Sequence, residues 1–382
     1  MMRLINTIKA SDWGLFFSSL ALSIVGIISI YSTKHVGEGG FFIKQSVWLL
    51  LGLIAFFIFS SIDYRFFKVH FLPVLLLYFA GVLLLFFVDL FGVQIRGAQS
   101  WISVGPINIE PVEVLKVIFI LISAKYFSQR HIEMHRLRHI IISGLYLLLP
   151  SVLIVRQPDI GSFIILALIW VGILIVSGIK LKHFLILTLL IIALAVYTWG
   201  FMLQDYQKSR ILTFLNPELD PYGAGYNSIQ SLIAVGSGGL WGNGLSQGTQ
   251  SQLGFLPEAH TDFIYAAIVE ELGIVVGVLI LIFYGFIFFK MMKIAKRAAD
   301  NFAKLVTVGV GIMFISQVGL NVGMTLGLLP ITGLTLPLVS YGGSSLLLLY
   351  ISLGIVNSIH INFTESVAIG SVDLTESGDS VT

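Results

Sequence analysis

Apolar runs long enough to cross a bilayer recur along almost the whole chain, and they limit its possible folds more than any other feature. An apolar run of about 18 residues or more is a candidate membrane helix, because that length spans the hydrocarbon core. There are ten, at about 13–31, 42–60, 71–91, 112–127, 140–155, 160–178, 184–201, 263–289, 306–328 and 338–359. The sequence therefore predicts an all-α polytopic membrane protein with about ten transmembrane helices.

Composition agrees with this fold class. Of the 382 residues, 57% are hydrophobic and only 11% are charged, whereas soluble domains carry about 25% charged residues. Most of the surface must therefore face membrane lipid. The net charge of +2 is too small for a nucleic-acid footprint, so no nucleic-acid partner is expected. The absence of cysteine excludes disulfides and thiolate chemistry.

Basic residues predict the orientation. If the N-terminus is cytoplasmic, fifteen Lys and Arg residues fall on the cytoplasmic side and six on the other, as the positive-inside rule requires. Both termini are then cytoplasmic. Residues 1–362 form a single transmembrane domain, in which residues 203–262 are a large extracytoplasmic loop between helices 7 and 8. Residues 363–382 are acidic and Ser-rich and predict a disordered cytoplasmic tail.

The Gly-rich stretch at 216–262 separates two very apolar segments and contains no Lys or Arg. A connection of this length is usually either functional or disordered. Its apolar residues give it a side that can pack, so we expect an ordered loop or re-entrant segment. Such a segment would present carboxylates at a membrane surface.

The strongest candidate site is the string LPEAHTD, which ends at Asp262. If a helix begins near Pro257, Glu258 and Asp262 lie one turn apart on one face. The positive N-terminal end of the helix dipole favours an acidic residue and readily explains the presence of Glu258. Asp262 is next to Phe263, where a carboxylate loses hydration and its pKa rises, as a general base requires. From this motif alone, catalysis and helix-end electrostatics are equally supported.

Glu270 and Glu271 follow in the same predicted span. Adjacent acids inside a span are costly unless they are paired or face a polar cavity. An internal structural pairing and a functional cavity are both open.

A second constellation begins in the loop with Arg96 and Trp101 and continues into a span with Glu113 and Lys116. Trp101 alternatively serves as an interfacial anchor. Glu113 and Lys116 are spaced i, i+3 and can pair. An intramembrane Lys is a functional-site hypothesis by default, although its stem also allows it to reach outward to the interface.

A third constellation is Arg156-Gln157-Pro158-Asp159, in the short turn between the fifth and sixth spans. Turn and cap chemistry alone accounts for Gln157 and Asp159, and lining an outer cavity is the alternative for Arg156 and Asp159. Residues 329–345 contain two Pro and several Gly, which predicts irregular backbone against protein or a wet cavity.

Six strings together carry a resemblance to a known family. They are GAQSWISVGP, RQPDIGS, TFLNPELDPYGAGY, QSLIAVGSGGLWGNGL, FLPEAHTDFIYA and LTLPLVSYGGSS. In this order they resemble motifs of the SEDS family of bacterial cell-wall polymerases, the RodA and FtsW group. The string GTQSQLGFLPE and Thr332 are more similar to the elongation-type RodA branch, while GLTLPLVSYGGSS is shared with the division branch.

The resemblance implies a peptidoglycan glycosyltransferase of the bacterial inner membrane that polymerises lipid II for cell-wall elongation and rod shape. It implies a class B penicillin-binding protein as transpeptidase partner. It assigns the catalytic acid to Asp262 and family positions to Trp101 and Lys116. The family's usual Gln-Pro-Ser-Glu is here Glu110-Pro111-Val112-Glu113, so the contacts of the replaced Gln and Ser do not transfer.

The resulting hypothesis is that Asp262 deprotonates the acceptor sugar, and undecaprenyl pyrophosphate leaves the donor. Arg96, Lys116, Arg210 or a divalent cation (Mg²⁺ or Mn²⁺) held by acids would stabilise the pyrophosphate; no organic cofactor is expected. The predicted substrate-binding residues are Trp101, Lys116, Glu113, Arg96, Arg210, Glu258, Gln157 and Asp159. The alternatives are a lipid II flippase, a division-type polymerase and a non-enzymatic scaffold for the transpeptidase.

Overall fold

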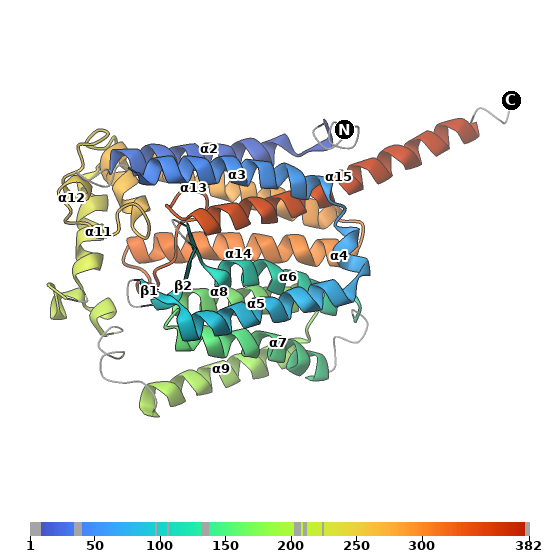
Figure 1. Cartoon of the computed structure of the whole chain (residues 1–382), viewed down its shortest axis with the longest axis horizontal. Helices are drawn as coiled ribbons and strands as arrows, with labels where there is room; N and C mark the ends of the chain where they lie inside the picture. The colour runs from blue at the N-terminus through green and yellow to red at the C-terminus, as the bar shows by residue number, and fades with distance from the viewer. Residues whose placement is uncertain are drawn as a thin grey trace.

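The computed structural model describes residues 9–33, 40–95, 98–104, 107–130, 137–201, 208, 212–223 and 225–378. The long helices lie side by side with similar directions and form one elongated bundle (Figure 1). They are α2 (Trp13–Ser32), α3 (Phe41–Ser61), α5 (Phe71–Phe91), α6 (Pro111–Ser128), α7 (Leu137–Arg156), α8 (Ile160–Val176), α9 (Leu181–Phe201), α13 (Ile264–Arg297), α14 (Asn301–Thr325) and α15 (Gly343–Gly378). The predicted all-α polytopic membrane fold is confirmed.

Within the described residues, seven helices are both long and apolar enough to cross a membrane: α2, α3, α5, α7, α13, α14 and the 343–364 part of α15. Two further apolar helices are shorter, namely α8 and the 181–190 part of α9. Helix α6 carries three charged residues in its 18. The protein is a multi-pass membrane protein, and the count of ten spans stays a prediction.

Helix α6 lies at the centre of the bundle. It packs against α5, α7, α8, α14 and α15. Every residue from Pro111 to Phe127 is buried except Val114, which is partly exposed. Protein therefore surrounds α6 in place of lipid, which explains how its charged side chains are accommodated.

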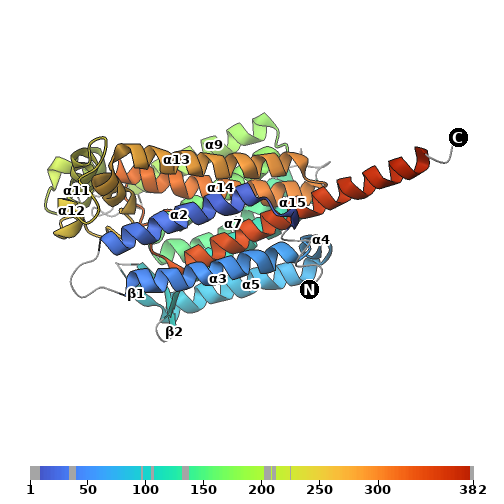
Figure 2. The ribbon, with the colours of Figure 1, turned by 90° about the horizontal axis from the view of Figure 1, so that it is seen from above.

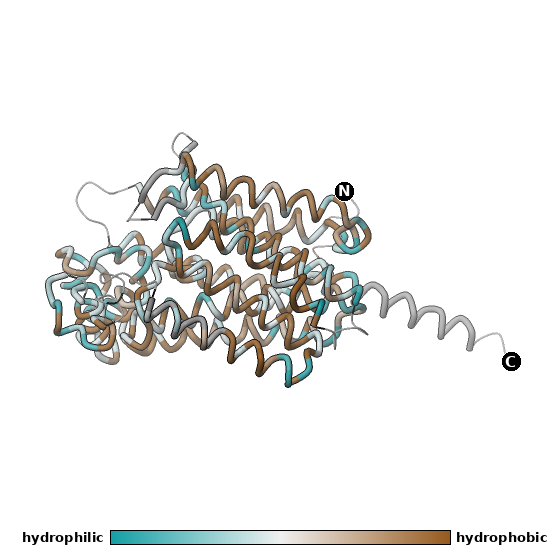
Figure 3. Tube along the Cα trace, turned by 90° about the horizontal axis from the view of Figure 1, so that it is seen from below, coloured by the Kyte–Doolittle hydropathy of each residue, from teal (hydrophilic) through white to brown (hydrophobic). Residues whose placement is uncertain are grey.

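The shorter elements gather at one end of the bundle. They include α11 (Tyr226–Ser237), α12 (Thr249–Gln252) and the 3-10 turn η2 (Pro217–Leu219). Helix α2 begins at the opposite end, near α4 (Arg65–Val69), and α15 extends beyond that end as well (Figures 1 and 2). Polar residues are concentrated at the α11–α12 end, whereas the long helices are mostly hydrophobic (Figure 3). The Gly-rich stretch therefore contains the helical elements η2, α11 and α12. Its membrane side stays a prediction.

A small antiparallel sheet is an addition to the predicted fold. It consists of β1 (Val93–Ile95), β2 (Ala98–Val104) and β3 (Ile107–Ile109), in the order β1-β2-β3. It packs against α5, α6 and α15. The sheet connects α5 to α6 and determines where α6 begins.

Helix α15 continues past residue 362, where the sequence analysis expected a disordered tail, and ends at Gly378. Helix α13 is interrupted at Gly273, whose φ of +84° and ψ of +168° are not helical. A side chain there is excluded, because a Cβ atom would lie 2.3 Å from the carbonyl oxygen of Leu240. The part of α13 before Gly273 is thus a short separate helix that packs against the Gly-rich stretch.

Candidate active site

Asp262 lies in non-helical backbone directly before α13. The helix begins at Ile264, and residues 257–263 form successive turns. The expectation of a helix beginning near Pro257 is therefore wrong, and Glu258 and Asp262 are not one helical turn apart. Glu258 has a φ of +55°, outside the helical region. Its carbonyl oxygen accepts two N–H groups from further along the chain, so this segment closes turns.

Three consecutive carbonyl oxygens at 260–262 are held by other parts of the chain. That of residue 260 accepts the N–H of Tyr341 (2.9 Å). That of residue 261 accepts the Oγ of Ser340 (2.5 Å), and that of Asp262 accepts the Nδ2 of Asn321 (2.8 Å). The same Nδ2 also donates to the carbonyl oxygen of Leu334 at 2.7 Å. The backbone that carries Asp262 is therefore tied to the segment before α15 and to α14.

The 332–334 backbone lies between Asp262 and the first turn of α8. A Cβ atom added at Gly333 would lie 3.8 Å from Oδ2 of Asp262. A Cβ added at Gly161 would lie 2.7 Å from Cγ of Leu334 and 2.8 Å from the carbonyl oxygen of Thr332. Three motifs that are distant in sequence thus meet around one carboxylate, and Asp262 is only 7% exposed.

Lys116 and Glu113 form an ion pair inside the bundle, with 2.7 Å between Nζ and Oε1. This confirms the pairing predicted from their spacing. Lys116 has no exposed surface, so its ammonium does not reach outward to solvent. Removing two charges from water costs free energy. A buried ion pair is therefore retained only where its charge has a function or where its geometry is excellent.

Glu110 is a member of the site that the sequence analysis did not select. It is the N-cap residue of α6 and is partly exposed. Low hydration raises its pKa well above the usual glutamate value, and the carboxylates of Glu113, Asp159 and Asp262 raise it further, while Lys116 lowers it. Lys116 in turn interacts electrostatically with Glu113, Glu110 and Asp159. Glu110 is therefore within electrostatic range of three other carboxylates and of Lys116, and these five residues are called the Asp262 cluster.

The other predicted residues have separate positions. Trp101 is on β2, partly exposed, paired with Val93 in the sheet above α6. Glu258 accepts a hydrogen bond from the hydroxyl of Thr261 (2.9 Å). Gln157 is buried and donates to the carbonyl oxygen of Leu85 in α5 (2.8 Å).

Asp159 caps α8 by accepting the N–H of Ser162 (3.0 Å), as the predicted cap chemistry requires. It also acts electrostatically on Glu110. Arg156 pairs with Asp89 at 3.3 Å. Arg96 and Arg210 lie outside the described residues.

Glu270 and Glu271 have structural partners. The carboxylate of Glu270 accepts the N–H groups of Gln250 (2.7 Å) and Ser251 (3.0 Å) at the start of α12. That of Glu271 accepts hydrogen bonds from Ser32 at the end of α2 and from Gln252. Both acids fix the Gly-rich stretch to α13, as the structural alternative predicted.

Metal binding has little support from the described side chains. No three or more His, Cys, Asp or Glu residues among them are grouped so that they could hold an ion. A divalent cation at the site stays a prediction.

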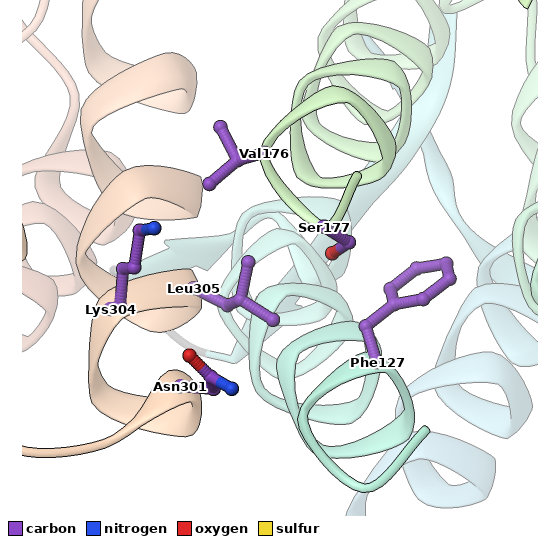
Figure 4. Close-up of a pocket in the computed structure, with 6 residues that line it drawn as sticks. All are labelled: Phe127, Val176, Ser177, Asn301, Lys304 and Leu305. Carbon is purple, nitrogen blue, oxygen red and sulfur yellow. The ribbon is translucent and has the colours of Figure 1, made fainter. Parts of the chain in front are cut away.

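A small cavity lies at the other end of the bundle, where α6 and α8 end and α14 begins (Figure 4). Its volume is about 10 Å³, which suits a single water molecule. It is lined by Phe127, Val176, Ser177, Asn301, Lys304 and Leu305. It is separate from the Asp262 cluster, which is near the other ends of these helices.

The residues that hold Asp262 in place were missed by the sequence analysis. Asn321 and Ser340 are buried, and Gln45 on α3 bonds to the backbone on both sides of Tyr341. A polar amide within an apolar span, as at Asn321 and Gln45, was the available signal.

The bundle of apolar helices, with acids and a buried lysine gathered near one end, defines a polytopic membrane protein with a candidate active site as the class of protein. Comparison with known families specifies it further: the model of the FtsW/RodA/SpoVE family, described as "Cell cycle protein", matches residues 10–365. The chain belongs to this family.

Curated relatives extend over most of the chain. The peptidoglycan glycosyltransferase MrdB of Escherichia coli K12 is 37% identical over 341 residues, covering 89% of this chain and 91% of the relative. The peptidoglycan glycosyltransferase RodA of Treponema pallidum is 33% identical, covering 93% and 99%. The protein is accordingly a peptidoglycan glycosyltransferase.

Solved structures agree. A chain from a peptidoglycan synthase complex that coordinates polymerization and crosslinking has a TM-score of 0.80 at 32% identity, covering 92% of this chain and 98% of that chain. The rod shape determining protein RodA of Thermus thermophilus has a TM-score of 0.68 at 28% identity, covering 92% and 96%.

Proposed function

We propose that this glycosyltransferase polymerises lipid II for cell-wall elongation, with Asp262 as general base. The observation that supports this best is the backbone of Thr261 and Asp262, which Ser340 and Asn321 hold through hydrogen bonds to its carbonyl oxygens. A base held within about 1 Å of its productive position is what acyl and glycosyl transfer require. Low hydration around a carboxylate also increases its proton affinity.

In the proposed reaction, Asp262 takes the proton of the acceptor sugar's 4-hydroxyl. The hydroxyl oxygen forms a bond to the anomeric carbon of the donor, and the bond from that carbon to the pyrophosphate oxygen breaks. Undecaprenyl pyrophosphate leaves with the electron pair, and inversion at the donor carbon produces a β-1,4 link. General-base catalysis contributes about 10²–10⁴-fold. Positioning and charge stabilisation supply the remainder.

Cations are needed for the leaving pyrophosphate. Lys116 is the described candidate, and Arg96 and Arg210 are the others. Trp101, Glu258, Gln157 and Asp159 stay predicted substrate contacts. A divalent cation would enter with the pyrophosphate, since no described trio of acids holds one. Loss of polymerisation in EDTA, restored by Mg²⁺ or Mn²⁺, would support the ion; unchanged activity would contradict it.

An apolar groove of about 900 Å³ between α5 and α7 suits a polyprenyl chain. Its lining is entirely apolar and includes Phe79, Phe86 and Leu149. Helix α5 continues from it into the sheet that carries Trp101, and α7 continues into the Gln157–Asp159 turn. A lipid lying in the groove would have its head group near the cluster.

We further propose the bacterial inner membrane as location, with both termini cytoplasmic and the Asp262 cluster on the outer side. The proposed partner is a class B penicillin-binding protein. The similarity to a chain of a synthase complex supports such a partner, and the distribution of Lys and Arg supports the orientation.

The decisive experiment is polymerisation of purified lipid II by the wild type and by Asp262→Asn, each with and without the transpeptidase. Abolished chain growth with an intact complex is expected. Growth retained by Asp262→Asn would exclude the base role, and would favour a scaffold. Lipid II transport across vesicles without chain growth would favour a flippase.

A further inference from the structure

Gln45 lies on α3, one turn after the helix begins, with only 2% of its surface exposed. Its Nε2 donates to the carbonyl oxygen of Ser340 at 3.0 Å, and its Oε1 accepts the N–H of Gly342 at 3.2 Å. One side-chain amide therefore holds the backbone on both sides of Tyr341. Neither bond is part of a helix or a sheet.

Ser340 connects this clamp to the backbone beside the proposed base. Its hydroxyl donates to the carbonyl oxygen of Thr261 at 2.5 Å and accepts the N–H of Leu336 at 2.7 Å. Ser340 is 4% exposed and Thr261 is 4% exposed, so water does not compete for these bonds. Two hydrogen bonds, one to the backbone and one from the side chain of Ser340, thus connect Gln45 through Ser340 to the residue preceding Asp262.

Helix α3 contacts the same turn a second time. The ring of Phe41 stacks on His260, with 4.8 Å between ring centroids and 17° between ring planes. The centroid of Tyr341 also lies 4.8 Å from that of Phe41. Because the two contacts are on successive turns of one helix, α3 fixes both the position and the orientation of the 260–262 backbone.

We propose that Gln45 is a positioning residue for the glycosyl transfer, acting on Asp262 through Ser340. The proposal rests on the proposed role of Asp262 as base. The hydrogen bonds of Gln45 go to Ser340 and Gly342. Gln45 therefore acts on the reaction by setting the position of the Asp262 carboxylate. Catalytic geometry is sensitive to such shifts, since a displacement of about 1 Å costs about 10²-fold in rate.

The simplest alternative is that Gln45 only stabilises the fold, as buried amides generally do. The two roles differ in what they change. A purely structural amide changes the amount of folded enzyme, and leaves the kcat of the folded fraction intact. A positioning amide lowers kcat at nearly constant KM, because substrate binding does not depend on the exact location of the base.

Gln45→Met removes both hydrogen bonds at similar side-chain volume. We expect kcat for lipid II polymerisation to fall by about 10- to 100-fold, with KM within about twofold. Rates are measured on the full-length monodisperse protein with its transpeptidase and normalised to folded enzyme. Gln45→Glu, which keeps an acceptor for Gly342 and loses the donor to Ser340, is expected to behave in the same way and replaces Gln45→Met if that variant does not fold.

Asn357→Leu is the matched control. Asn357 is a fully buried amide on α15. It accepts the N–H of Asp12 and donates to Ser11 and Ser60, at 2.9, 3.0 and 3.0 Å. It thus ties α15 to α2 and α3 at the opposite end of the bundle. Its loss is expected to lower thermal stability while kcat stays within about twofold of wild type.

A double-variant cycle tests the route through Ser340. If Gln45 acts through Ser340, Ser340→Ala lowers kcat similarly and Gln45→Met adds little to it, because residues in one network are not additive. Unchanged kcat in Gln45→Met, or losses that multiply fully in the double variant, would overturn the proposal. Asp262→Asn is measured alongside: if it retains activity, the base role fails, whereas an inactive Asp262→Asn with normal Gln45 variants refutes the positioning role alone.

Discussion

The side-chain amide of Asn321 donates to the carbonyl oxygen of Asp262 at 2.8 Å, and the same nitrogen donates to the carbonyl oxygen of Leu334 at 2.7 Å. Asn321 is completely buried in α14. It joins the turn before α13 to the segment before α15 at the place where the carboxylate cluster lies. No helical or sheet hydrogen bond provides this connection.

Asn321→Leu should therefore lower both stability and polymerisation. Two buried carbonyl oxygens lose a donor, which costs about 1–3 kcal/mol for each group left unsatisfied. Thermal unfolding in detergent and lipid II polymerisation measure the two effects. Gln317→Leu, one turn deeper in α14, is the control: the buried Oε1 of Gln317 accepts no hydrogen bond from the described residues. Equal losses in both variants would contradict the connecting role of Asn321.

Substitution of one member of the Lys116–Glu113 pair should destabilise the protein, whereas substitution of both members together should be tolerated. Glu113→Gln leaves the Lys116 ammonium buried without its counter-charge, and removal of one partner of such a pair costs about 3–5 kcal/mol. Glu113→Gln combined with Lys116→Met removes both charges of the pair, so stability should recover in part, because Glu110 and Asp159 still lose the attraction of Lys116. Polymerisation should stay lost if Lys116 stabilises the pyrophosphate. A recovered polymerisation rate in the double variant would remove Lys116 from the reaction.

Glu110→Gln should increase stability at neutral pH. Because the pKa of Glu110 is raised above its usual value of 4.5, the folded state binds more protons than the unfolded state. The free energy of unfolding of the wild type therefore falls as the pH rises from about 4.5 through the raised pKa of Glu110. Glutamine does not titrate, so the stability of the variant should exceed that of the wild type at pH 7 and approach it near pH 4. Melting temperatures across this range test the prediction, and parallel curves for the two proteins would contradict it.

Gly273→Ala should destabilise the protein strongly, whereas Gly285→Ala in the same helix should not. At Gly273, φ is +84° and a Cβ atom would lie 2.3 Å from the carbonyl oxygen of Leu240. At Gly285 the φ is not positive and no atom lies within 4 Å of an added Cβ, so alanine there should stabilise by about 0.5–1 kcal/mol. Thermal unfolding of both variants measures the contrast. Equal melting temperatures would mean that α13 is continuous in solution.

Sequence periodicity and length predicted most of the helices, because a membrane span is defined by local apolarity alone. The Lys116–Glu113 pair was predictable for the same reason: a spacing of three along a helix determines which side chains meet. The beginning of α13 was not predictable in this way. The left-handed φ of Glu258 depends on bonds that the turn makes with itself, with the hydroxyl of Ser340 and with the N–H of Tyr341, and no local pattern specifies them.

The site was predicted in part. Asp262, Glu113, Lys116 and Asp159 all act electrostatically on Glu110, while Gln157 bonds to Leu85 of α5; their roles in substrate binding and catalysis stay predictions. The supporting amides Gln45 and Asn321 were missed because their partners are backbone atoms far away in sequence. A sequence reveals a polar residue within a span, but it does not show which carbonyl oxygen that residue reaches.

The burial of α6 has a consequence for biogenesis. A segment carrying Glu113, Lys116 and Lys125 partitions poorly into lipid by itself, since charged side chains within a span are costly to insert. Its stable residence in the bilayer thus depends on being enclosed by α5, α7, α8, α14 and α15. Two of these helices, α14 and α15, are synthesised long after α6. Lys116 is therefore fully enclosed only after these later helices have been made.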